Sequence, residues 1–190
     1  MADPSAPQLV LDTIDEWREW LCDNHQTSSG VWLIFWRKDS GREPLDYDEA
    51  VREALCWGWI DGHTRVFDEA RRGMWFTRRG RNSPWAASNK ARVADLIESG
   101  RMQPAGQAVV DDAKARGLWT IFDDAEAGIE PPELTAALDA NPTARANWDA
   151  FPPSARKMGL AQIALAKRPE TKTKRIATIV EEAGLNIRPS

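Results

Sequence analysis

The stretch Cys56-Trp57-Gly58-Trp59-Ile60-Asp61-Gly62 places two indoles, two glycines and one carboxylate within seven residues. Two glycines lose much backbone freedom on folding, and a carboxylate among indoles loses its hydration. Neither is expected of an ordinary surface loop. We therefore predict that this stretch forms a buried turn around which the rest of the chain is arranged.

An arginine-rich segment follows this stretch. Between His63 and Arg92 there are eight Lys and Arg residues and two acidic residues, whereas the whole chain has a net charge of −4. The positive charge is therefore concentrated in one segment. A basic surface on an acidic protein typically faces an anion, which can be a small ligand, an acidic partner or a phosphate backbone.

The chain of 190 residues is long enough to bury a sizeable core. Its first residues lack the basic and apolar regions of an export signal, and no apolar run approaches the ~18 residues that a membrane span requires. We expect a cytoplasmic protein without a membrane span. Cys22 and Cys56 both have apolar and aromatic neighbours, which favours two buried thiols over a disulfide.

The first half of the chain has signals for both helices and strands. Helical spacing begins at Asp12 or Thr13, and a second helix is expected after Asp46, which can cap it. The run 31–36 is apolar on both faces and is typical of a central strand, while 64–68 and 73–78 resemble the two strands of a hairpin. The simplest assembly is a three-stranded, largely antiparallel sheet with helices on one face.

The second half has the pattern of an all-helical region. Six prolines each precede a run with helical spacing, and proline is favoured at the first helical position. They are Pro84, Pro104, Pro132, Pro142, Pro153 and Pro169. Ser83 is expected to cap a helix over 84–99, and the acidic segment 123–128 is expected to be a solvated connector.

The sequence thus predicts an α+β protein with three parts. Residues 1–10 are rich in Pro, Ala and Ser and are expected to be disordered. Residues 11–120 are expected to form the α+β core that carries the basic segment, and residues 121–190 a helical region.

Several motifs together resemble one known family. They are Ala54-Leu55-Cys56-Trp57-Gly58-Trp59-Ile60-Asp61-Gly62, Arg65, Phe76-Thr77 with Arg79, Ser83 with Trp85, Asn89, Gly100-Arg101-Met102 with Ala105-Gly106, and Ala166-Lys167-Arg168-Pro169-Glu170-Thr171-Lys172 with Arg175-Ile176. The chain resembles the YdeI or OmpD-associated family, also called bacteriocin-protection, from about residue 12 to 183. Arg78 and Ala86 depart from the proline and serine that are usual in that family.

The resemblance implies a bacterial protein that protects against bacteriocins or cationic antimicrobial peptides, in the manner of a stress response. The family name also implies an association with an outer-membrane porin. The absence of an export signal argues against a direct porin partner here. The resemblance names no reaction.

Asp61 is the candidate catalytic residue. In an aromatic setting it needs a cation to remain ionised, and Arg65 or Arg79 is the expected partner. A structural ion pair and a role as general acid or base both remain open. The two histidines, His25 and His63, have no metal-ligand spacing with the cysteines, so neither a metal nor a cofactor is expected.

We predict one polar pocket where the hairpin meets the helix expected to start at residue 84. Indole walls with a few fixed polar groups are typical of small-molecule sites. Its expected residues are Trp59, Asp61, Arg65, Thr77, Arg79, Ser83, Trp85 and Asn89. The alternative is that these side chains satisfy one another as part of the core.

Three classes of function fit these observations. The first is binding of a small anionic ligand in a protective role, and the second is an enzyme acting on a small anionic substrate through Asp61. The third is an interaction module. Its partner would be a protein bound through the basic C-terminal helices or a single-stranded nucleic acid, and the acidic pI of 5.3 argues against nucleic acid.

Overall fold

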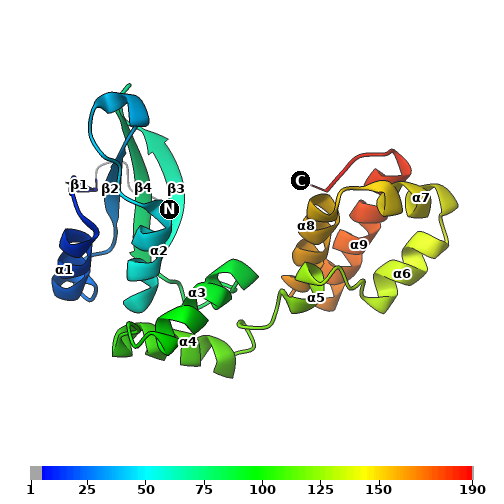
Figure 1. The fold of residues 1–190 in the computed structure, drawn as a ribbon. Helices are drawn as coiled ribbons and strands as arrows, with labels where there is room; N and C mark the ends of the chain where they lie inside the picture. The colour runs from blue at the N-terminus through cyan, green and yellow to red at the C-terminus, as the bar shows by residue number, and fades with distance from the viewer. Residues whose placement is uncertain (1–5, 190) are drawn as a thin grey trace. The chain divides into compact units, whose positions relative to one another are not determined.

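The computed structural model describes residues 6–189, apart from the side chain of Lys38, and consists of two compact units (Figure 1). The first unit contains the residues up to Ser83 together with Ser88–Arg116. The second contains Pro84–Ala87 and the residues from Gly117 onward. The chain therefore enters the second unit, returns to the first, and enters the second again.

The first unit contains a four-stranded mixed sheet, in the order β1 (Gln8–Leu9), β2 (Val31–Trp36), β4 (Arg71–Arg78) and β3 (Trp59–Val66). Strand β1 is parallel to β2, and the other neighbours are antiparallel. The prediction of a three-stranded antiparallel sheet is therefore wrong. A strand of two residues is too short to show alternation, so only its pairing with β2 reveals it.

Strand β1 lies within the segment 1–10 for which we predicted disorder. Its residues pair with Trp32 and Leu33, and the Trp32 N–H also donates to the Pro7 carbonyl at 3.0 Å. Residues 1–5 lie outside the described residues.

The first two helices begin at their predicted caps. Thr13 and Glu16 form a reciprocal capping box at the start of α1 (Ile14–Asn24). The Asp46 side chain accepts the Glu49 N–H at 2.9 Å at the start of α2 (Tyr47–Cys56). A 3-10 turn, η1 (Lys38–Ser40), lies between β2 and α2.

Indoles join α1 and α2 to one face of the sheet. Trp17 stacks on Trp20 with ring centroids 5.3 Å apart and meets Phe76 of β4 at 5.2 Å. The Trp17 indole N–H donates to the Ala50 carbonyl of α2 at 3.0 Å, and Trp20 meets Trp59 edge-on. Because Trp17, Trp59 and Phe76 are fully buried, this aromatic cluster is the core of the first unit.

The predicted buried turn is confined to Trp57 and Gly58, since β3 already begins at Trp59. Gly58 has a φ of 74°, a conformation that favours glycine. Nearby, a Cβ atom on Gly106 would lie 2.3 Å from the Cys56 carbonyl oxygen. Helix α4 (Pro104–Ala115) therefore packs directly on the backbone at the end of α2, and α3 (Ala87–Glu98) precedes it.

The described part of the second unit is helical, as predicted. Its helices are α5 (Asp123–Glu126), α6 (Pro132–Asp139), α7 (Pro142–Ala150), α8 (Pro153–Ala164) and α9 (Pro169–Gly184). Four of them begin at a predicted proline, and so does α4. Their shared core is centred on Trp148, Leu134 and Leu138, all fully buried.

Two details of this half differ from the prediction. Residues 123–126 form helix α5, because Ala125 is buried in the helical core. Helix α3 begins at Ala87, three residues after the predicted start at Pro84. In the intervening segment the Trp85 N–H donates to the Leu118 carbonyl at 3.2 Å, which takes this backbone out of the helix.

Candidate functional site

Asp61 lies on β3 and is held by a residue that the sequence analysis did not select. The Tyr47 hydroxyl, at the start of α2, donates to the Asp61 carboxylate at 2.5 Å. Burial, and then this hydrogen bond, raise the pKa of Tyr47 to about 12. The phenol therefore remains protonated at neutral pH and can act as a donor to Asp61.

Arg79 follows β4 and is the basic residue most affected by burial in this region. Its backbone N–H donates to the Gly58 carbonyl at 2.9 Å, which ties it to the predicted turn. Burial lowers the pKa of Arg79 to about 10, and the charge of Asp61 opposes this effect. The electrostatic interaction of Asp61 with Arg79, one of its two expected partners, is thus present, although the direct hydrogen bond to Asp61 comes from Tyr47.

Two more predicted residues fix this end of the hairpin. The Trp59 indole N–H donates to the His25 carbonyl at 3.1 Å, and the Thr77 hydroxyl donates to the Ser29 carbonyl at 2.8 Å. Both therefore tie the sheet to the loop after α1. This anchoring holds the backbone that carries Asp61 and Arg79.

The other predicted site residues have different surroundings. Arg65 is exposed and lies over the Phe67 ring, 4.8 Å from its centroid. The Asn89 side chain accepts from Arg92 at 2.9 Å, and the Ser83 backbone closes a turn with the Gly80 carbonyl. All three residues belong to the first unit.

Trp85 belongs to the second unit, where it is fully buried beside Trp119 with ring centroids 5.0 Å apart. Nearby, the Ala87 N–H at the start of α3 donates to both carboxylate oxygens of Glu126, at 3.0 and 2.9 Å. We predicted that this helix would start at residue 84. The observed start is at Ala87, and the anion there is a side chain of the protein itself.

Much of the basic segment is neutralised within the protein, which its sequence did not reveal. Arg71 pairs with Asp68 at 2.7 Å, Arg81 with Asp112 at 3.2 Å and Arg92 with Asp48 at 2.6 Å. Two of these carboxylates come from α2 and α4, outside the segment. Charge segregation in the sequence therefore does not by itself predict an equally basic surface.

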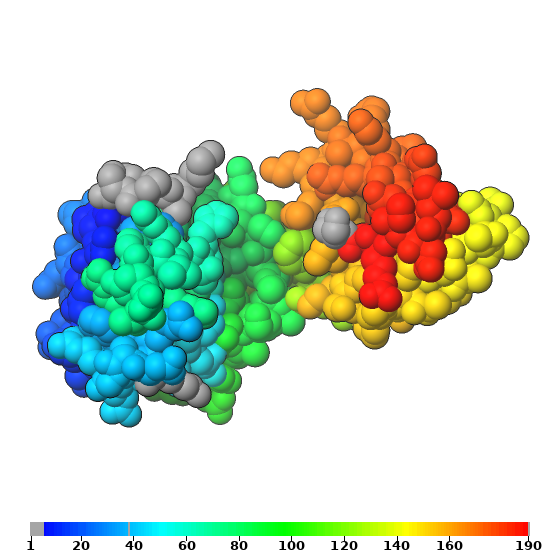
Figure 2. Space-filling view, turned by 90° about the horizontal axis from the view of Figure 1, so that it is seen from above, coloured from blue at the N-terminus to red at the C-terminus, as the bar shows by residue number. Residues whose placement is uncertain are grey.

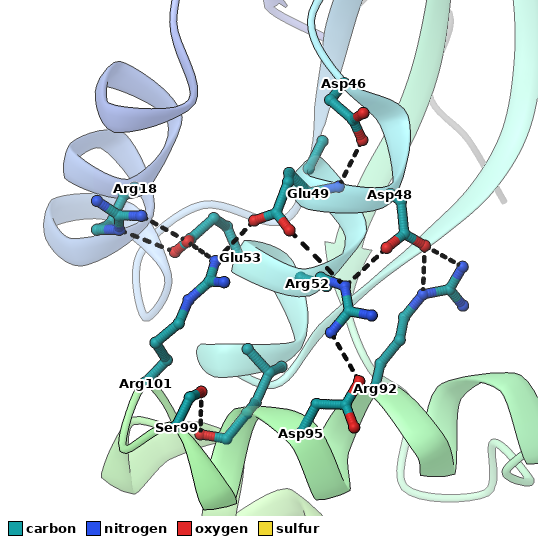
Figure 3. Close-up of polar contacts among 12 residues, drawn as sticks. Arg18, Asp46, Asp48, Glu49, Arg52, Glu53, Arg92, Asp95, Ser99 and Arg101 are labelled. Atoms are coloured by element: carbon teal, nitrogen blue, oxygen red, sulfur yellow. Dashed lines mark hydrogen bonds and ion pairs between the residues drawn. The ribbon is translucent and has the colours of Figure 1, made fainter.

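Further ion pairs are centred on Glu53 of α2 (Figure 3), which is 2% exposed. Its carboxylate accepts from Arg18 at 2.8 Å and from Arg101 at 2.5 Å. Burial alone would raise the pKa of Glu53, but the hydrogen bonds from the two arginines outweigh it and lower the pKa. Glu53 is thus an ionised, buried group that connects α1, α2 and the segment before α4.

A cavity of 310 Å³ lies beside Glu53. Its lining residues are Arg18, Glu53, Cys56, Trp57, Arg101 and Gln103. Cys56 is free and buried, and burial followed by the charge of Glu53 raises the pKa of its thiol to about 12. A thiol with that pKa is a poor nucleophile at neutral pH. Cys22 is also free, but it is exposed rather than buried as predicted.

Tyr47, which is bonded to Asp61, and Glu53, which anchors the ion pairs, are two residues that the sequence analysis did not select. A signal existed for Glu53, because it stands three residues after Ala50 and so shares the inner face of the helix. Tyr47 had no comparable signal, because its relation to Asp61 depends on how α2 packs beside β3.

Within the described residues, no three His, Cys, Asp or Glu side chains are grouped as metal ligands would be. No helix in the described part of the chain has the length and apolar character needed to cross a bilayer.

Comparison with family models identifies two regions of the chain. Residues 9–109 match the model of a family described as a domain of unknown function, DUF8412. The chain belongs to this family. Residues 128–185 match the model described as "Bacteriocin-protection, YdeI or OmpD-Associated", which confirms the family resemblance for this part of the chain. Searches of curated proteins and of solved structures found no match.

The two matches divide the motifs that suggested the resemblance. The Trp-rich stretch 56–62, Asp61 and Arg79 lie in the DUF8412 region, and the run from Ala166 to Ile176 lies in the bacteriocin-protection region. The DUF8412 region thus contains Tyr47, Glu53 and the hairpin, while the bacteriocin-protection region contains most of the second unit's helices.

Proposed function

We propose that the DUF8412 region binds a small anionic ligand at the end of the hairpin that carries Asp61 and Arg79. This binding would serve protection against bacteriocins or related antimicrobial peptides in the cytoplasm, as part of a stress response. The match of residues 128–185 to the bacteriocin-protection family supports the protective role.

One observation carries the choice of an anion. Arg79 is held by its backbone on Gly58, and burial depresses its pKa to about 10 despite the nearby charge of Asp61. Desolvation thus makes the positive charge less favourable at this position, and a further negative charge beside it would favour the charged form. An anion bound there would supply that charge, since charge-assisted hydrogen bonds to a guanidinium are strong.

Thermal unfolding in the presence of citrate, inorganic phosphate or sulfate tests the proposal. At about ten times its Kd, a ligand that binds only the folded state adds about 1.4 kcal/mol, or roughly 4 °C for a chain of this size. Arg79→Ala should abolish that shift, while Arg78→Ala, a change of the exposed neighbour, should retain it. If none of the anions stabilises the wild-type protein, or if Arg79→Ala responds like the wild type, the proposal is wrong.

A second candidate function is an enzyme in which Asp61 transfers a proton to or from a small anionic substrate. The observation that favours it is the 2.5 Å hydrogen bond from Tyr47, which places a protonated phenol beside a carboxylate. Such a pair can hold or move a proton at the Asp61 oxygen. Under this proposal, Asp61→Asn would abolish turnover with the fold intact, and Tyr47→Phe would reduce it.

A protein partner is a further proposal and concerns the basic residues around α9. Lys167, Arg168 and Lys174 are exposed and form no ion pair within the described residues. Side chains of this part of the chain, coloured orange, project from the second unit in Figure 2. An acidic protein surface would bind them with an affinity that falls as salt is added.

A further inference from the structure

The second unit contains a cavity of 370 Å³ at the start of α8. Residues from α5, the segment after it, α7 and α8 surround the cavity. They are Ala125, Glu126, Ala127, Gly128, Glu130, Trp148, Pro153, Ser154, Arg156, Lys157 and Leu160. Its volume is within the range of small-molecule sites.

Both carboxylates of the lining are already engaged by other groups. Glu130 accepts two hydrogen bonds from Arg145, each 2.8 Å, and one from the Trp148 indole N–H at 2.8 Å. Glu126 accepts the Ala87 N–H. Arg145 therefore compensates the charge of Glu130, whereas Glu126 is bound by a neutral backbone N–H.

The two cations of the lining have no such partners. Neither Arg156 nor Lys157 forms an ion pair within the described residues, in contrast to Arg145. The Nε–H of Arg156 is buried and has no hydrogen-bond partner. A buried donor without an acceptor is unfavourable, so an acceptor supplied by a ligand would stabilise this arrangement.

Several other residues of the wall are apolar. Trp148 is fully buried, its ring is fixed by the hydrogen bond to Glu130, and Leu160 and Ala125 belong to the same hydrophobic core. A wall of this kind favours a ligand with an apolar part over a bare inorganic ion.

We propose that this cavity binds a small organic anion. Its carboxylate or phosphate group contacts Arg156 and Lys157, and its apolar part packs beside Trp148 and Leu160. This site lies in the bacteriocin-protection region and is separate from the anion site proposed at Arg79.

The test is a titration of the full chain in which nuclear magnetic resonance monitors the Arg156 Nε–H signal. This signal is assigned by its absence from the spectrum of Arg156→Lys. The probes are phenyl phosphate and hexanoate, with inorganic phosphate and hexyltrimethylammonium as controls. We expect both organic anions to shift this signal at probe concentrations of about 1–10 mM. Comparing phenyl phosphate with hexanoate then shows whether a phosphate or a carboxylate group binds more tightly.

The variant Arg156→Ala/Lys157→Ala should weaken binding of the organic anions about tenfold or more, because it removes the charge-assisted hydrogen bonds. For this variant, binding is followed at the Trp148 indole N–H signal. The matched control is Lys174→Ala, which removes an exposed cation of the same unit outside the cavity. Lys174→Ala should bind like the wild type.

Several outcomes would overturn the proposal. The first is that neither organic anion shifts the Arg156 signal. The second is that Lys174→Ala weakens binding of the organic anions as much as Arg156→Ala/Lys157→Ala does. The third is that hexyltrimethylammonium binds as tightly as the organic anions. Inorganic phosphate binding as tightly as phenyl phosphate would refute the role of the apolar wall. Repeating the titration in Arg79→Ala separates the two sites, since binding at α8 should be retained whether or not the Arg79 site exists.

Discussion

Two carboxylates of the first unit, Glu53 and Asp61, have opposite surroundings. Glu53 is buried and accepts from two arginines, so its charge is compensated within the protein. Asp61 is partly exposed, accepts from a neutral phenol and lies near Arg79, whose pKa burial lowers. The first arrangement is that of a structural ion pair, whereas in the second the direct hydrogen bond to the carboxylate comes from an uncharged group. Charge compensation, rather than the number of charges, therefore distinguishes a scaffold from a candidate site.

The largest expected effect comes from removing the charge of Glu53. Glu53→Gln leaves Arg18 and Arg101 without their shared anion and should lower the free energy of unfolding by about 3 kcal/mol. Urea denaturation measures this change. The control is Asp15→Asn, since Asp15 is an exposed partner of Arg18 and its loss should cost less than about 1 kcal/mol. Equal effects of the two changes would contradict a structural role for Glu53.

The same comparison predicts a difference in acid stability. The folded-state pKa of Glu53 is lowered, so the unfolded chain takes up a proton there first as the pH falls below about 4.3. The stabilisation by Glu53 is therefore present above that pH and is lost as the pH falls through the folded-state pKa. Urea denaturation at a series of pH values from neutral into this acid range should show that the difference in the free energy of unfolding between wild type and Glu53→Gln becomes smaller. If this difference in the free energy of unfolding stays constant, the Glu53 charge is not linked to folding.

The Asp61 side of the comparison can be tested by titrating Tyr47, the single tyrosine of the chain. The phenolate absorbance should appear with a pKa of about 12 in the folded protein and about 10 in urea. Because the pKa of Tyr47 is higher in the folded state than in the unfolded state, the free energy of unfolding should fall as the pH rises from about 10 to about 12. Asp61→Asn should move the folded-state pKa toward its ordinary value, and an unchanged titration curve would exclude the Tyr47 to Asp61 hydrogen bond in solution.

The smallest expected effect is that of Asp61→Asn on stability. It weakens one partly exposed hydrogen bond with a neutral donor, so we expect a loss of about 1 kcal/mol in urea denaturation. The direct partner is a neutral phenol, and the change also removes the electrostatic interaction between Asp61 and Arg79. A loss as large as that of Glu53→Gln would place Asp61 in the scaffold and remove the distinction between the two carboxylates.

Local signals in the sequence predicted those elements whose ends are set by neighbouring residues. Thr13 with Glu16, Asp46 with Glu49 and the apolar run 31–36 each determine structure within a few positions. Strand β1 could not be found in this way, because two residues become a strand only through pairing with β2. The late start of α3 depends similarly on the contact of Trp85 with Leu118, which is distant in sequence.

The candidate site was only partly predictable for the same reason. The unusual composition around Asp61 and Arg79 drew attention to residues that do lie near each other, and the structure adds Tyr47 as the group bonded to Asp61. The carboxylates that neutralise the basic segment come from α2 and α4, so counting charges along one segment overestimated its free positive charge. Whether the eight predicted residues form one pocket remains a prediction.

The path of the chain between the two units has a consequence for dissecting the protein. Pro84–Ala87 belong to the second unit, although the residues on both sides of them belong to the first. A fragment that ends at Arg116 would contain Trp85 without Trp119 and would expose an indole that is 1% exposed in the whole protein. The DUF8412 match, residues 9–109, has the same property. The inherited sequence module and the physical folding unit therefore have different borders here. A chimera that exchanges the helical unit between relatives must also exchange these four residues, or provide a small side chain in place of the indole.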